Sequence, residues 1–308
     1  MTAVRILERV HRRAPFGLRL WDVALGRFVS DDGVQVDLAP SGRPWLRVRC
    51  RLNRSGVFQA LDVPGLRDFE LSDPETALPA GRPYRIEVRD PSGAFLPLAF
   101  DVDLPRPGPI IDLPLLTAPP RMLDSSAAPS TDPSSPAGLS DPPAIGVPLF
   151  TAPGRPVPEG MAVVRADVRE LDTGRPAAWC LAVARVDGAP RGIGLADQDG
   201  RLTIVFPYPE RAAPALASPA PARNDFRWIV ELSAFYRSRP AGAPVADSAD
   251  ATAVLGQLAQ PATVLRVTGS PPQSQPLQPQ PLTYPVPLSV PHRSDPAEAS
   301  PFLYLGTE

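Results

Sequence analysis

The chain contains no lysine, and several other residue types are scarce. All 31 basic residues among its 308 residues are arginine, and aromatic residues make up only 6%. The formal net charge is −2, so no general electrostatic attraction draws the protein to nucleic acid or to an anionic membrane. We therefore expect no nucleic-acid partner. The scarcity of aromatic residues means that each core must consist mainly of Val, Leu, Ile and Ala.

Cysteine and histidine are too few for the usual metal and thiol chemistry. Cys50 and Cys180 lie in different halves of the chain, and His11 and His292 lie near its ends. This pattern does not support a disulfide framework or a zinc site with four Cys or His ligands. A serine hydrolase triad would need a histidine in the body of a domain. We expect no cofactor, no metal and no enzymatic activity.

No apolar run approaches the ~20 residues that a membrane-spanning helix needs. The first 17 residues are basic but lack the apolar centre of a secretory signal. The sequence therefore predicts a cytoplasmic protein that does not insert into a membrane.

Proline, in contrast, is abundant, with 44 residues. Because proline breaks helices and is confined to the turns and edges of sheets, a mainly helical fold is excluded. Alternation of apolar and polar residues, as in residues 84–88, is typical of half-buried strands. Turn signals recur every 8–12 residues or so, a spacing typical of β-sandwiches. We predict an all-β fold with two tandem Greek-key β-sandwiches of the transthyretin or immunoglobulin kind.

Changes in composition divide the chain into five parts. Between residues 117 and 147 Ser, Pro, Asp and Ala dominate and the periodicity disappears, so we expect an extended, semi-rigid spacer there. The predicted parts are an N-terminal arm at 1–14, a first β-sandwich at 15–116, a Pro/Ser-rich linker at 117–147, a second β-sandwich at 148–268 and an extended Pro-rich tail at 269–308.

The tail ends in four apolar residues, Phe302, Leu303, Tyr304 and Leu305. Such a segment either packs back on its own domain or docks into a neighbouring subunit as an added strand. The long spacer that precedes it favours docking. We predict these four residues as a site of partner docking.

Two turn patterns occur in both halves and indicate an internal repeat. Asp22…Gly26-Arg27 aligns with Asp172-Thr173-Gly174-Arg175, and Asn53–Phe58 aligns with Asp197–Leu202. Each half then has a glycine turn, a pair of strands and a second glycine turn before an apolar strand. The predicted turn residues of the repeat are Asp172, Gly174, Asp199 and Gly200.

The pattern in the second half resembles a known family. Its first block has Asp172, Thr173, Gly174 and Pro176, and its second has Asp197, Asp199, Gly200 and Arg201. These blocks are similar to those of the carboxypeptidase-regulatory-like, transthyretin-like family of seven-stranded Greek-key sandwiches. The resemblance covers about 40 residues. It implies a non-catalytic module of a larger assembly.

A vaguer resemblance extends over several segments of the chain. PFGLRLWDVALGR, RSGVFQALDVPGLRDFE and FLPLAFDVDLPRPG are similar to accessory proteins of phage-tail-like contractile injection systems. This resemblance implies a structural role, with other protein subunits of the particle as partners. The alternative is a carbohydrate-binding or ligand-binding module of the adhesin or fibre type.

Three groups of residues test these alternatives. Four tryptophans could form a sugar-binding platform but are more often core anchors: Trp21, Trp45, Trp179 and Trp228. The carboxylates of Asp187, Asp197 and Asp199 could bind calcium, although turn chemistry is favoured because the other oxygen ligands are missing. Glu70 and Asp73 lie in an expected loop, and we interpret them as solvated rather than as a catalytic pair.

Overall fold

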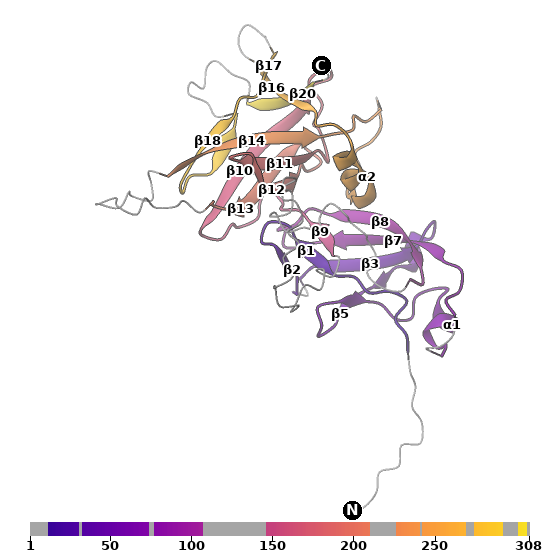
Figure 1. The fold of residues 1–308 in the computed structure, drawn as a ribbon. Helices are drawn as coiled ribbons and strands as arrows, with labels where there is room; N and C mark the ends of the chain where they lie inside the picture. The colour runs from indigo at the N-terminus through magenta and orange to yellow at the C-terminus, as the bar shows by residue number, and fades with distance from the viewer. Residues whose placement is uncertain are drawn as a thin grey trace, which may run out of the picture.

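A computed structural model describes residues 12–30, 33–73, 77–106, 146–209, 226–240, 242–268, 274–291 and 301–306. The predicted all-β fold is confirmed, because nearly all regular structure consists of strands (Figure 1). The described residues include two short α-helices, α1 (Arg67–Glu70) and α2 (Ala251–Gly256), and two 3-10 turns, η1 (Pro44–Leu46) and η4 (Gln257–Ala259).

The first half of the chain, together with β15 from the second half, forms two facing layers. One is a five-stranded sheet in the order β15-β8-β7-β3-β4, and the other consists of the sheet β2-β1-β9 and the ribbon β5-β6. The bounds are β1 (Leu20–Asp22), β2 (Arg27–Phe28), β3 (Gln35–Pro40), β4 (Val48–Arg49), β5 (Arg51–Leu52), β6 (Phe58–Gln59), β7 (Arg82–Arg89), β8 (Leu98–Leu104), β9 (Val147–Leu149) and β15 (Ala249–Asp250).

The second half also has two layers. One sheet has the order β13-β10-β20-β16-β17, with β19 also beside β10, and the other has the order β12-β11-β14-β18. The bounds are β10 (Met161–Glu170), β11 (Leu181–Val186), β12 (Ala189–Leu195), β13 (Arg201–Pro207), β14 (Arg227–Phe235), β16 (Val264–Thr268), β17 (Ser274–Pro276), β18 (Gln280–Thr283), β19 (Leu288–Val290) and β20 (Phe302–Gly306).

Alternation along the strands explains where the two cores lie. In β7, Tyr84, Ile86 and Val88 are buried, whereas Arg85 and Glu87 face outward. The second core uses many small residues, because β10 and β11 contribute alanines and valines to its centre. Both cores therefore depend mainly on aliphatic side chains, as the composition predicted, and burial of these side chains is the main term that stabilises the sheets.

The last strand of the first half shows that the predicted domain boundaries were wrong. β9 pairs in parallel with β1, with Leu20 opposite Val147, and Val147, Leu149 and Phe150 are buried in the first core. β8 and β9 both belong to the first half, so the chain between them does not connect two sandwiches. The sequence showed where periodicity is lost but not which sheet the next strand joins. Most of the predicted linker, residues 117–145, lies outside the described residues.

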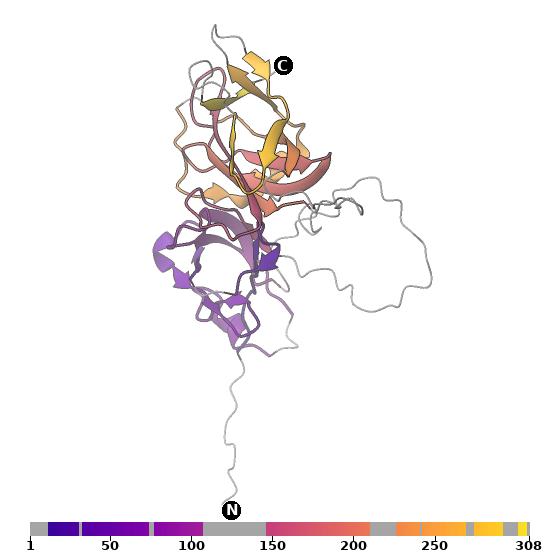
Figure 2. The same ribbon diagram turned by 90° about the vertical axis from the view of Figure 1, so that its left-hand side faces the viewer.

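The two halves pack against each other through one continuous apolar cluster. Trp179 and Leu181 of the second half belong to the first core, and so does the buried face of α2. The strand that precedes α2 extends the first sheet, since Ala249 of β15 lies opposite Leu98 of β8. Figures 1 and 2 show the halves stacked, with α2 at their junction in Figure 1. Sequence reasoning placed this α2 segment wholly in the second domain.

The described parts of the predicted tail are not an extended arm. They form four strands, β17 to β20, of the second half. β20 lies between β10 and β16, and Leu303 and Leu305 are buried while Phe302 and Tyr304 are half-buried. The predicted docking segment therefore completes the sheet of its own domain, because its alternation fits the open position beside β10. The length of the preceding spacer carried no information on this choice.

Backbone pairing reproduces the predicted internal repeat. Leu18 and Phe58 bridge each other in the first half, as Ala166 and Leu202 do in the second. At the ends of the first strands, the amide of Val23 donates to Leu149, and the amide of Leu171 donates to Leu305. Each half is thus closed by its last strand, which lies parallel to its first strand.

We predict that Leu303→Ala lowers the free energy of unfolding by about 3 kcal/mol, since it leaves a cavity in the second core. Urea unfolding of the full chain measures this value. Leu71→Ala is the matched control, because Leu71 is 52% exposed, and it should change stability by less than ~1 kcal/mol. Equal and small effects of both substitutions would show that the C-terminal segment is not part of the sheet.

Candidate functional site

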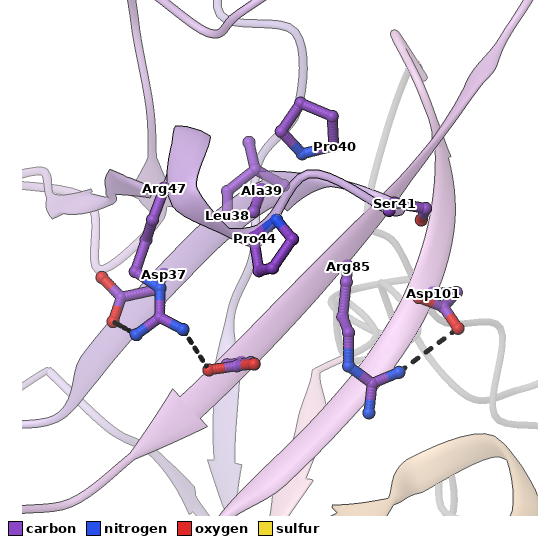
Figure 3. Close-up of a pocket in the computed structure, with 11 residues that line it drawn as sticks. Asp37, Leu38, Ala39, Pro40, Ser41, Pro44, Arg47, Arg85 and Asp101 are labelled. Carbon is purple, nitrogen blue, oxygen red and sulfur yellow. Dashed lines mark hydrogen bonds and ion pairs between the residues drawn. The ribbon is translucent and has the colours of Figure 1, made fainter.

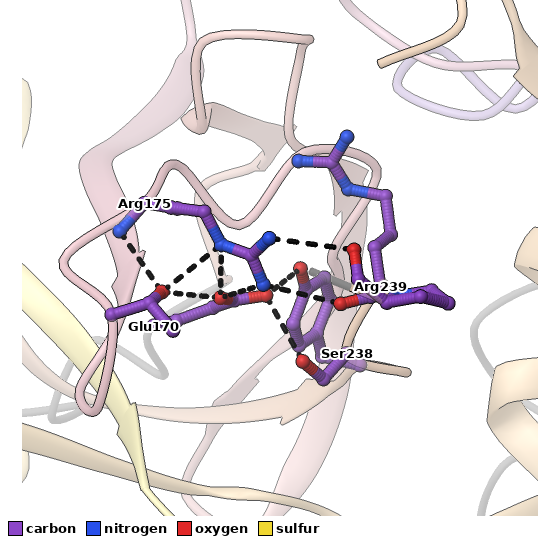
Figure 4. Close-up of polar contacts among 7 residues, drawn as sticks. Glu170, Arg175, Ser238 and Arg239 are labelled. Carbon is purple, nitrogen blue, oxygen red and sulfur yellow. Dashed lines mark hydrogen bonds and ion pairs between the residues drawn. The ribbon is translucent and has the colours of Figure 1, made fainter. Parts of the chain in front are cut away.

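Among the described residues, a densely connected polar centre surrounds Glu170 at the end of β10 (Figure 4). One carboxylate oxygen accepts hydrogen bonds from Thr173 Oγ1 at 2.5 Å and from Nε and Nη2 of Arg175 at 3.0 and 2.8 Å. The other accepts from the Tyr236 hydroxyl at 2.8 Å and the Ser238 hydroxyl at 3.1 Å. The acceptor capacity of this carboxylate is therefore largely occupied.

Opposing effects act on the pKa of Glu170. Burial alone would raise the pKa, but the hydrogen bonds from Thr173, Tyr236, Arg175 and Ser238 outweigh it and lower the pKa to about 2. Burial and the bond to Glu170 raise the pKa of Tyr236 to about 12. Neither group changes its protonation near neutral pH, so this pair is unsuited to general acid–base catalysis. The centre fixes a turn and leaves no free reactive group among these side chains.

A corresponding centre occurs in the first half around Asp22. Its carboxylate accepts from the backbone of Ala24 and from both terminal nitrogens of Arg155, at 3.1 and 2.5 Å. In both centres the amide of a glycine four residues later donates to the backbone oxygen of the acid: Gly26 to Asp22 and Gly174 to Glu170.

This geometry corrects the sequence alignment of the repeat. Asp22 corresponds to Glu170, whereas Asp172 is exposed and makes no interaction with another described residue. The spacing of four residues from acid to glycine, which the two halves share, was the signal that could have identified Glu170. Gly174 itself was predicted correctly as a turn residue and has a φ of +67°.

The second predicted turn agrees with the structure in detail. The carboxylate of Asp197 accepts from the amides of Asp199 and Arg201 at 2.9 and 2.8 Å. The Asn53 side chain makes the same two bonds in the first half, to Ser55 and Val57. The favoured turn chemistry of Asp197 is therefore confirmed.

Asp199 and Gly200 complete this turn. The Asp199 carboxylate lies 3.6 Å from Arg201, and both side chains are exposed. Gly200 has a φ of +80°, a conformation that glycine adopts without steric cost. Within the described part of the chain, no group of three His, Cys, Asp or Glu residues is placed to hold a metal ion.

Buried Glu70 and the two buried cysteines are structural as well. Glu70 is fully buried and accepts from the amides of Asp62 and Val63 and from Arg12 at 2.6 Å, so the expectation that it is solvated was wrong. Cys50 and Cys180 are free thiols, and burial raises the pKa of each to about 12. At neutral pH neither forms the thiolate that nucleophilic chemistry requires.

The predicted N-terminal arm is described only at residues 12–14. Arg12 binds Glu70 and Asp62, and the amide of Arg13 donates to the backbone oxygen of Glu70. These contacts attach this part of the arm to the first half. Residues 1–11 lie outside the described residues.

The four tryptophans occupy different environments. Trp179 and Trp228 are buried, so neither can serve as a sugar-binding platform. Trp21 packs edge-to-face on Phe28 at a centroid distance of 4.9 Å. Trp45, in η1, is 73% exposed. It is the tryptophan available to a ligand or partner.

A shallow pocket of about 420 Å³ lies beside η1 on the outer face of β3, β7 and β8 (Figure 3). We call this surface the β3–β7–β8 face; it is lined by charged side chains that include Asp37, Arg47, Arg85, Glu87 and Asp101. Arg47 pairs with Glu87 at 3.1 Å and Arg85 with Asp101 at 3.3 Å. Exposed ion pairs add little stability, so these charges are available for recognition at small cost to the fold.

No protein-family model, no curated protein and no solved structure matches this chain. Within the described residues, no helix is both long enough and apolar enough to cross a membrane.

We predict that Glu170→Gln lowers the free energy of unfolding at pH 7 by about 3 kcal/mol, because Arg175 loses its charged partner. The pKa of Glu170 in the folded protein lies below the ordinary value of about 4.3. Its contribution to the free energy of unfolding is therefore complete above that pH and is lost as the pH falls toward 2. Urea unfolding between pH 7 and pH 2.5 should show the two proteins converging. Asp172→Asn is the control and should match the wild type at pH 7; equal loss in both variants would contradict the corrected alignment.

The two predicted turn glycines should respond differently to substitution. A Cβ at Gly200 would clash with the backbone oxygen of Val168, whereas a Cβ at Gly174 meets nothing within 4 Å. Both have positive φ, which costs alanine about 1 kcal/mol. We expect Gly174→Ala to cost about that amount and Gly200→Ala about 3 kcal/mol or more, measured by thermal unfolding. A larger effect at Gly174 would be inconsistent with this geometry.

Proposed function

We propose that this protein is a non-catalytic structural component of a large protein assembly, of the phage-tail-like contractile injection type suggested by the resemblance in its sequence. One observation supports this most strongly. The two halves are joined by a continuous apolar cluster, and the acids at the ends of their first strands are committed to holding turns. Such a body is suited to bearing load and holding neighbours, and its polar centres are already occupied.

Adhesion is assigned to the β3–β7–β8 face rather than to the C-terminal segment. Leu303 and Leu305 are buried in their own sheet, which removes them as docking residues. Exposed Trp45 instead adjoins this face in sequence, since it follows Pro44 of η1, which lines the pocket with Arg47 and Arg85. Tryptophan and arginine are the residue types most enriched among energetically dominant interface residues. The paired charges of this face would favour a partner with a matching pattern.

The second candidate function is a carbohydrate-binding or ligand-binding module. The observation that favours it is the exposure of Trp45 in η1, whose residue Pro44 lines a pocket of about 420 Å³, since an exposed indole can stack on a ligand. On this alternative the isolated protein binds its ligand without other subunits.

We predict that Trp45→Ala reduces incorporation into the assembly at least about fivefold, as expected for loss of an interface anchor. The measurement is the fraction of protein that sediments with high-molecular-weight particles from the native cell. Stability of the purified variant should change by less than ~0.5 kcal/mol, because Trp45 is exposed. Ile229→Ala is the matched control, since Ile229 is 50% exposed on the second half.

Three outcomes separate the candidates. Loss with Trp45→Ala but not with Ile229→Ala supports adhesion through this face. Unchanged sedimentation of both variants contradicts it. Normal sedimentation of Trp45→Ala, together with glycan binding by the purified wild type that this variant lacks, would favour the ligand-binding module.

A further inference from the structure

A cavity of about 650 Å³ lies on the outer face of β10, near the connection between the two halves. Its polar lining comes from three neighbouring strands, β10, β13 and β19, and its apolar rim from three prolines. The polar residues are Arg165, Asp167, Arg201, Thr203 and Ser289. The prolines are Pro153, Pro291 and Pro301.

The cavity results from an interruption in the strand beside β10. β19 pairs with Val164–Ala166 of β10, and β20 pairs with the next residues, Asp167–Glu170. Two strands therefore share one edge of β10 end to end. The cavity lies where the first ends and the second begins.

Arg165 is the central cation of this site. Its side chain is exposed and makes no hydrogen bond or ion pair with any other residue that the structure describes. Thr203 of β13 and Ser289 of β19 lie directly opposite it on either side. A guanidinium flanked by two hydroxyl groups is a suitable donor set for an oxygen anion.

Thr203 is a second, independent sign of a missing ligand. Thr203 is 2% exposed, and its side-chain hydroxyl has no hydrogen-bond partner. Buried hydroxyl groups are normally paired, so an unpaired one calls for an explanation such as a bound ion or water. Thr203 is one of the residues that line the cavity together with Arg165.

The charges of the cavity favour an anion. Arg165 and Arg201 contribute two positive charges, and Asp167 contributes one negative charge. Arg201 is partly neutralised by Asp199 at 3.6 Å. Because Asp167 would repel a second negative group, the site suits one anionic group rather than a polyanion.

We infer that this cavity binds a single oxyanion, a carboxylate or a phosphate, through the Arg165 guanidinium with Ser289 and Thr203 as hydroxyl donors. The inference does not depend on the proposed function. The anion can come from solution or from a partner.

The test is titration of the full chain with inorganic phosphate, and separately with acetate, followed by calorimetry or by NMR of arginine side chains. We expect saturable binding of one anion per chain, weakened about tenfold or more by Arg165→Gln. Thr203→Val should weaken binding about threefold without loss of stability, because the hydroxyl has no partner to lose. Arg191→Gln is the matched control, since Arg191 is also exposed and no other described residue interacts with it.

Absence of saturable binding of either anion to the wild type overturns the inference. Equal weakening by Arg165→Gln and Arg191→Gln overturns it too, because it would show only general charge attraction.

Discussion

The architecture depends on one kind of pairing, in which the last strand of each half lies parallel to its first strand. β9 closes the first half on β1, and β20 closes the second on β10. Pairing two strands that are far apart in sequence closes a long loop, and this closure has a cost in conformational entropy. Burial of the apolar side chains of β9 and β20 offsets this cost. The sheet that contains β1 is therefore complete only when β9 is in place, and the sheet that contains β10 only when β20 is in place.

The buried acids reinforce these closures at the same positions. Asp22 is the last residue of β1, and Glu170 is the last residue of β10. Both acids therefore lie directly beside the closing strands. Arg155, the partner of Asp22, belongs to the connection that follows β9 and also lies over the Phe95 ring at 4.5 Å. This ion pair therefore holds the connection between the halves against the first half. A buried acid and arginine that satisfy each other in this way fix one arrangement, because removal of either leaves an uncompensated charge.

Local signals in the sequence predicted the fold class and the turns, but not the long-range connections. Proline content, alternation and the turns at Gly26, Gly56, Gly174 and Gly200 depend on short-range sterics, and all four glycines have positive φ. The partner of β9 depends on which sheet offers an open edge, which a spacer such as residues 117–147 does not reveal. Glu170 was missed because Asp172 lies closer to the glycine in sequence, although the structure uses an acid four residues away.

The placement of charged groups, buried or on the surface, determines which of them are available for binding. Where an acid is buried, as at Glu170, its hydrogen bonds hold a turn and keep its pKa far below neutral pH. Glu170 itself therefore does not supply a group whose protonation changes near neutral pH. Where charges remain available, as at Arg165 and on the β3–β7–β8 face, they lie on outer surfaces of sheets whose inner faces form the cores. Substitutions on these surfaces can therefore change recognition without disturbing the closing strands.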